Sequence, residues 1–177
     1  YHIYYKYHNI HNVELCVKIL DLLIEIQQGE SQDNIDLMLR KTFINDLCNT
    51  LSHFNANLDL LARGYQLNPN HPALMNLKSK VLIILKDIVE KSDPSNLDKI
   101  AHFMDLKALI STFKDNLIAF HKRKRACPTK ETLRTEDIWD VNLSNALMVY
   151  CILKELSFEE VNEEFTPEIR QIIKEIL

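Results

Sequence analysis

The feature that most limits the possible folds of this chain is its scarcity of glycine. Its 177 residues include two glycines, Gly29 and Gly64, and five prolines. Glycine supplies the positive φ angles of tight hairpin turns and allows the close backbone approach that phosphate-binding loops need. Two isolated glycines can form neither GxGxxG nor GxxxxGK[ST], so the sequence excludes a Rossmann or P-loop nucleotide site.

Apolar residues instead recur at helical spacing, most clearly near the start of the chain. Residues 13–28 are apolar around most of a helix, and their charges follow steps of four, three and four, which form one narrow stripe: Glu14, Lys18, Asp21 and Glu25. We interpret this stripe as the polar side of a plain amphipathic helix packed within its own domain, with contact to a neighbouring domain as the alternative. Asn12 is the predicted N-cap, and a left-handed Gly29 is predicted to end the helix.

The same periodicity predicts helices along the rest of the chain, with short connections and no credible pair of strands. Ser95 is predicted to cap the short helix that begins there. The sequence therefore predicts an all-α fold, an armadillo/HEAT-like array of about eight or nine antiparallel helices, although it shows no repeat of fixed period. The remaining predicted helices span 34–53, 56–67, 73–91, 95–104, 106–120 and 135–156, with one or two more in 157–177.

The net charge of −4 and the pI near 6.0 argue against a nucleic-acid binder, which normally carries a basic surplus. One basic run, Lys122, Arg123, Lys124 and Arg125, begins a stretch without apolar periodicity, and we predict a flexible loop over 122–134. This run is interpreted as a solvated loop; a localisation signal or a contact with acidic lipids is the alternative.

The extent and setting of the chain can also be predicted. No apolar run approaches the ~20 residues that a membrane crossing needs, so we expect no direct membrane insertion. The chain starts at Tyr1 without an initiator Met. We therefore expect 1–177 to be a single helical domain from a larger protein.

The four dispersed cysteines indicate buried thiols in a reducing compartment.

Candidate catalytic and metal-binding residues are few. His8, His11 and Cys16 have the chemistry of zinc ligands, but a zinc site needs three or four ligands and no second pair stands at a suitable spacing. His102 and Asp105 resemble half of a metal-dependent phosphohydrolase site, and we predict instead that they cap a helix end. The sequence thus predicts no enzymatic activity, no cofactor and no bound metal.

The first predicted helix and the corner after it resemble the helical domain associated with the homology region shared by inositol trisphosphate receptors and ryanodine receptors. The residues that match the pattern of that domain are Asn12, Val13, Leu20, Leu23, Glu25, Gln28, Gly29 and Asn34. The chain departs from the pattern at Glu30-Ser31, where the family has Pro-Cys, and at Ile35, where it has Gln. A similar succession of apolar helices continues to Leu156.

This resemblance implies a non-enzymatic scaffold or relay domain in the cytosolic assembly of a tetrameric, ligand-gated intracellular calcium-release channel. Its place would be the cytoplasmic face of the endoplasmic reticulum membrane. Its partners would be neighbouring domains of the same chain and adjacent subunits, without nucleic acid. Gln28, Gly29 and Asn34 would form a structural corner, with Gln28 hydrogen-bonded across it.

The charged stripe of the first helix and the basic run 122–125 are the possible interaction surfaces of such a domain. The alternative function is an unrelated armadillo/HEAT or tetratricopeptide-like protein interaction module. Residues 61–70 resemble the second helix of a tetratricopeptide repeat and the Asn-Pro turn that follows it.

Overall fold

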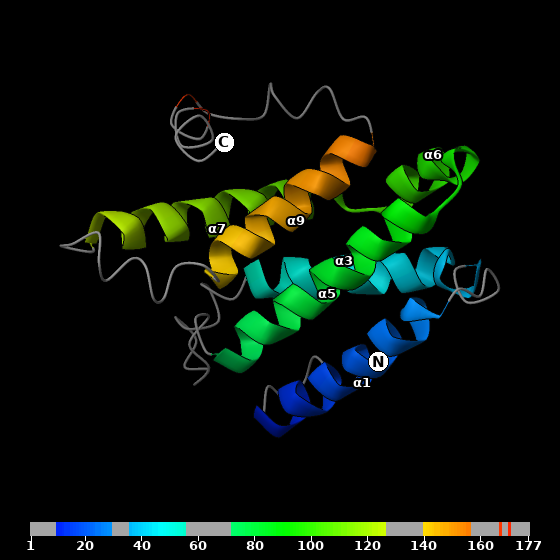
Figure 1. Cartoon of the computed structure of the whole chain (residues 1–177), viewed down its shortest axis with the longest axis horizontal. Helices are drawn as coiled ribbons and strands as arrows, with labels where there is room; N and C mark the ends of the chain where they lie inside the picture. Colours follow the sequence, from blue (N-terminus) through cyan, green and yellow to red (C-terminus); the bar gives the residue numbers. More distant parts are fainter. Residues whose placement is uncertain are drawn as a thin grey trace.

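The computed structural model describes residues 10–29, 36–55, 72–126 and 140–156, together with Pro167 and Arg170. Nearly all of these residues are helical and none of them lies in a strand, which confirms the all-α class (Figure 1). A short helical segment spans 36–38, and the longer helices are α1 (Ile10–Gln28), α3 (Lys41–Asn55), α5 (Pro72–Lys91), α6 (Pro94–Phe103), α7 (Leu106–Ala126) and α9 (Val141–Glu155).

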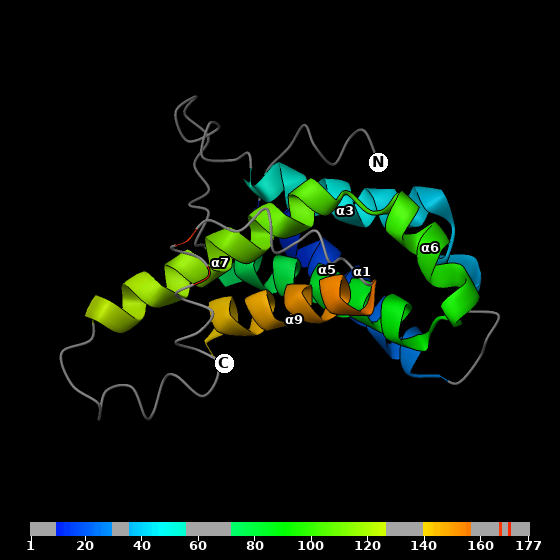
Figure 2. The same cartoon turned by 90° about the horizontal axis from the view of Figure 1, so that it is seen from above.

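Helix α5 forms the centre of the molecule because it is apolar on more than one side. It packs against α1, α3 and α9, and Figure 2 shows α3 and α9 on opposite sides of it. Its buried residues are Leu74, Leu77, Val81, Leu82, Ile84, Leu85, Ile88 and Val89. The described helices therefore gather around a central helix, an arrangement that does not confirm a linear stack of armadillo or HEAT repeats.

Helix α7 completes the bundle by packing against both α9 and α3, while α6 covers the end of the bundle beside α3. The side chains of Leu109, Phe113 and Leu117 on α7 are buried, as are Val149 and Ile152 on α9. These residues join the apolar surface of α5 in one continuous core. The predicted helices over 56–67 and 157–177 fall mostly outside the described residues, so the expected total of eight or nine stays a prediction.

Several helix boundaries differ from the predicted ones. Helix α1 begins at Ile10, which places Asn12 inside the helix and makes the predicted N-cap wrong. The helix predicted over 34–53 is interrupted at Leu39 and Arg40, and α3 begins after this break. The N-cap of α6 is Asp93 and not Ser95, because Pro94, whose φ is fixed near the helical value, takes the first helical position.

The basic run also lies in a helix. Helix α7 continues to Ala126, so the prediction of a flexible loop from residue 122 is wrong for the segment 122–126, and residues 127–139 lie outside the described part. Apolar periodicity stops at Phe120, yet the helix continues, because cationic side chains interact favourably with the carbonyl end of a helix. Helix α9 begins at Val141 and not at the predicted residue 135.

One end of α7 is fixed by an acidic cap beside a buried thiol. The Asp105 carboxylate accepts hydrogen bonds from the Ala108 amide at 3.0 Å and from the Ser52 hydroxyl at 3.4 Å, which confirms the prediction that Asp105 caps a helix end. The pKa of the neighbouring Cys48 thiol is raised to about 11, mainly by burial; a hydrogen bond with the Asp105 backbone lowers it, and the Asp105 charge raises it. Cys48 is therefore held in its neutral form.

Truncating the central helix is expected to destabilise the whole bundle. Leu85 is fully buried, so Leu85→Ala removes apolar contacts and leaves a cavity among several helices. We expect the free energy of unfolding in urea to fall by about 2–5 kcal/mol. Asn76→Ala, on the exposed side of the same helix, is the matched control and should change it by less than about 0.5 kcal/mol. Equal effects of the two variants would contradict a central α5.

The buried thiol gives stability a defined dependence on pH. The folded chain keeps the Cys48 proton up to about pH 11, whereas the ordinary thiol pKa is 9.0. The stability contributed by the neutral thiol is therefore fully present below pH 9 and lost as the pH rises toward 11. Between these values, wild type should lose roughly 2–3 kcal/mol of unfolding free energy relative to Cys48→Ala, as measured by urea denaturation. A constant difference between the two proteins would show that the Cys48 thiol is not desolvated.

Candidate functional site

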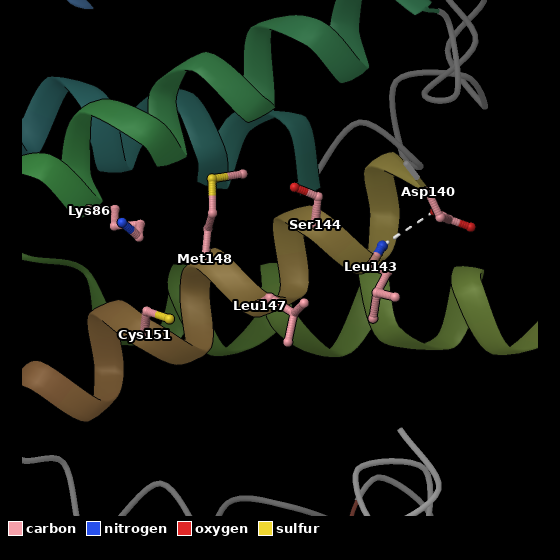
Figure 3. A pocket seen from close by; sticks show the side chains of 7 residues that line it. All are labelled: Lys86, Asp140, Leu143, Ser144, Leu147, Met148 and Cys151. Carbon is pink, nitrogen blue, oxygen red and sulfur yellow. Dashed lines mark hydrogen bonds between the residues drawn. The ribbon is translucent and has the colours of Figure 1, made fainter. Parts of the chain in front are cut away.

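An apolar groove lies between α5 and α9 and is the candidate functional site (Figure 3). Its volume is about 290 Å³. Lys86 comes from α5, whereas the other residues come from α9 and its N-terminal cap. The lining consists of Lys86, Asp140, Leu143, Ser144, Leu147, Met148 and Cys151. Apolar surface dominates this lining, so the groove suits an apolar side chain or one side of an amphipathic helix.

The groove exists because α9 is apolar on nearly all sides. Residues 146–153 form an unbroken apolar run, and one side of it, including Ala146 and Val149, is buried in the bundle. The other side has no described helix to cover it, which leaves 40% of Leu147 and 37% of Tyr150 exposed. Aromatic and large aliphatic side chains in such positions are typical of the core of a protein interface.

The N-terminus of α9 is held by a buried carboxylate. The Asp140 side chain is 1% exposed and accepts hydrogen bonds from the Asn142 amide at 2.7 Å and the Leu143 amide at 3.3 Å. Its second oxygen accepts from the guanidinium of Arg123, near the end of α7. Asp140 thus caps α9 and joins it to α7 through an ion pair.

A polar contact inside the core joins α9 to α5. Asn145 is fully buried, and its Oδ1 accepts a hydrogen bond from the Ser79 hydroxyl at 2.8 Å. The Asn145 amide nitrogen has no hydrogen-bond partner within the described part of the chain. Because a buried amide is costly unless it is paired, this contact favours one relative position of the two helices. The walls of the groove are therefore fixed.

The charged end of the groove is formed by Lys86. Its ammonium group donates to the Glu90 carboxylate at 2.6 Å, and this hydrogen bond raises the pKa of Lys86. Lys86 therefore stays cationic beside the half-buried thiol of Cys151.

The sequence analysis predicted a structural corner at the C-terminal end of α1, with Gln28 as its hydrogen-bonding residue. The structure buries the neighbouring glutamine instead. Gln28 and Gly29 are exposed, and Asn34 lies outside the described residues. The buried side chain is that of Gln27, whose amide donates to the Ile84 carbonyl at 3.4 Å. Gly29 ends α1 by donating to the Ile26 carbonyl at 3.3 Å without a positive φ, so the predicted left-handed conformation is wrong.

Most of the residues predicted to form interaction surfaces are exposed, but two of them form ion pairs within the bundle. Glu14, Lys18 and Glu25 are exposed along α1, whereas Asp21 is half-buried and pairs with Lys80 of α5 at 2.7 Å. Among the basic residues, Lys122, Lys124 and Arg125 are exposed at the end of α7, and Arg123 is bound to Asp140. The two sets of residues do not combine into one site.

The groove residues were missed by the sequence analysis. The signal was present in the apolar run 146–153, which is too broad for a helix with a single buried side. Periodicity alone does not show which part of that run remains uncovered, because the answer depends on where α5 and α7 pack. The tertiary structure identifies Leu147 and Tyr150 as the exposed members.

Among the described residues, no three His, Cys, Asp or Glu side chains come together to hold a metal ion. His102 is exposed on α6 beside the Phe103 ring, and Asp105 is engaged as a helix cap. None of the described helices combines the length and the apolar character needed to cross a membrane.

Comparisons of the chain with models of protein families, with curated proteins and with solved structures found no match.

The ion pair between Arg123 and Asp140 is expected to hold α9, which supplies most of the groove lining, against α7. Arg123→Ala leaves the buried Asp140 carboxylate without its cationic partner, so the free energy of unfolding should fall by about 1–3 kcal/mol. Lys122→Ala removes an exposed cation from the same turn and should change it by less than about 0.5 kcal/mol. Urea denaturation of both variants measures the difference, and equal losses would mean that the ion pair does not hold α9.

Proposed function

We propose that this chain is a non-catalytic helical domain that docks a neighbouring part of a larger assembly and passes displacement to the rest of its own bundle. The observation that carries the proposal is the apolar groove along α9, with Leu147 and Tyr150 exposed on a helix whose other side is buried. The occupant is an amphipathic helix of a neighbouring domain or subunit, whose apolar side would cover these residues.

The attachments of α9 support a relay role. A force on a helix bound in the groove would act on α9, which is joined to α7 by Arg123 and Asp140 and to α5 by Ser79 and Asn145. Helix α5 in turn packs against α1 and α3. Closely packed helices with fixed polar contacts move as units, so displacement at the groove would reach the opposite side of the bundle.

The family resemblance gives this role a setting. The residues from Asn12 to Asn34 that resemble the helical domain of inositol trisphosphate and ryanodine receptors suggest the cytosolic assembly of a tetrameric calcium-release channel. The docked helix would then belong to another domain of the same chain or to an adjacent subunit, at the cytoplasmic face of the endoplasmic reticulum. The domain would carry ligand-dependent movement toward the pore and would itself have no catalytic residue.

The second candidate is an unrelated module of the armadillo, HEAT or tetratricopeptide kind that binds a segment of a separate protein. The groove also favours this function, because its mainly apolar lining, with Leu147 exposed, suits an apolar segment of a partner. The two candidates differ in whether the occupant belongs to a channel.

A photo-crosslinking residue at position 147 separates the two candidates. In the protein expressed in its native cells, we expect an adduct between position 147 and another segment of a calcium-release channel. The same crosslinker at Asp98, which is exposed on α6 away from the groove, is the control and should give no such adduct. An adduct with a separate, non-channel protein supports the second candidate, and equal labelling from both positions contradicts both.

The channel function has its own readout in the same cells. Leu147→Asp places a charge in the groove and should lower ligand-evoked calcium release from membrane vesicles, because the docked helix loses its apolar contact. Asp98→Ala should leave the release unchanged. Release that is unaffected by Leu147→Asp contradicts a relay through the groove.

A further inference from the structure

The side of α1 that faces away from α5 carries a stripe of large apolar side chains. Their exposed fractions are 57% for Leu15, 50% for Ile19, 57% for Leu22 and 39% for Ile26. The four residues are separated by four, three and four positions, so they lie along one side of the helix with the spacing of a coiled-coil seam. We call these residues the α1 stripe. Large apolar side chains gathered on one exposed side of a helix are typical of protein interaction sites.

The α1 stripe cannot turn inward, because the opposite side of the helix is fixed on α5. Val13, Leu20 and Gln27 are buried there at intervals of seven residues. The Lys80 ammonium pairs with Asp21 at 2.7 Å, and the Lys91 ammonium donates to the Gln27 carbonyl at 2.7 Å. Helix α1 also lies at one edge of the bundle of described helices (Figure 1). The stripe is therefore presented outward by a rigidly held helix.

We infer that the α1 stripe binds the α1 stripe of a second copy of this chain, with the two helices antiparallel. The spacing of the stripe reads the same in both directions, so an antiparallel copy brings all four residues into register. Leu15 then lies opposite the partner's Ile26, and Ile19 lies opposite the partner's Leu22. Each contact pairs a leucine with an isoleucine, and the arrangement is a closed two-fold dimer.

The charges beside the stripe select this orientation. Lys18 and Glu25 are exposed, and each directly precedes a stripe residue, so both lie on the same flank. In an antiparallel pair the equivalent flanks of the two helices face each other, which brings Lys18 close to the partner's Glu25 and repeats the contact by symmetry. In a parallel pair, Lys18 would face the partner's Leu23, which is partly buried against the core of its own chain. Only the antiparallel pair has complementary charges.

The small size of the stripe sets the strength of the dimer. Four side chains from each copy bury less surface than the ~1,200 Å² at which stable interfaces begin, so the dimer belongs to the weak, reversible class. We expect the dissociation constant of the dimer to lie in the micromolar range. This inference does not depend on the α9 groove, which lies on a different helix and would be occupied by a different partner.

Sedimentation equilibrium of the full chain over a wide range of concentration tests the dimer. The wild-type chain should change from monomer to dimer as its concentration rises. Ile19→Glu and Leu22→Glu should remain monomeric at every concentration, because each places two carboxylates in the apolar seam. Both positions are exposed, so urea denaturation should show that the variants still fold. Leu147→Glu, a matched change in the α9 groove, should dimerise like wild type.

A charge exchange tests the orientation of the helices. Lys18→Glu puts like charges opposite each other at two places and should weaken dimerisation about tenfold. Adding Glu25→Lys to the same chain restores opposite charges in the antiparallel pair and should return the dissociation constant to near the wild-type value.

Three results would overturn the inference. The first is a wild-type chain that is monomeric throughout the concentration range. The second is a dimer that survives Ile19→Glu or is abolished by Leu147→Glu, since either result places the contact elsewhere. The third is failure of Glu25→Lys to rescue Lys18→Glu, which excludes the antiparallel orientation.

Discussion

Burial of α5 is the interaction on which the rest of the structure depends. This helix is apolar over so much of its surface that one neighbour cannot cover it, and α1, α3 and α9 each bury a different side. Apolar surface removed from water stabilises the fold in proportion to its area, so the chain gains most by surrounding α5 rather than by stacking its helices in sequence order. Helices α1 and α9, which both carry exposed apolar residues, are consequently fixed on the same central helix.

Polar groups inside this apolar bundle determine how its helices are aligned. The Ser79 hydroxyl can give its single proton either to Asn145 at 2.8 Å or to the Met75 carbonyl at 3.0 Å, and Gln27 reaches the backbone of α5 at Ile84. Oε1 of Gln27, like Nδ2 of Asn145, lacks a partner within the described residues. Such contacts contribute little net energy, but sliding a helix would leave more buried groups unpaired, so they favour one alignment over its neighbours.

The surfaces proposed for binding arise from helices with more apolar residues than their own bundle can cover. In α1 the charged residues occupy a narrow stripe, and the apolar residues beside it are divided between the contact with α5 and the outward stripe that contains Ile19 and Leu22. In α9 the run 146–153 is divided in the same way between the core and the groove. The uncovered part is rigid in both cases, and a rigid surface binds a partner at a lower entropic cost.

The sequence by itself determined the helical class, the existence of a long helix near 73–91, and the role of Asp105 as a cap, because periodicity and capping are local properties. It could not identify Asp140 and Arg123 as a pair, Gln27 as the buried glutamine, or Leu147 and Ile19 as exposed. Each of these depends on which helices pack together across distant parts of the chain. Only the tertiary structure decided these pairings and exposures. The local sequence of a helix that is apolar on several sides does not specify which side neighbouring helices will cover.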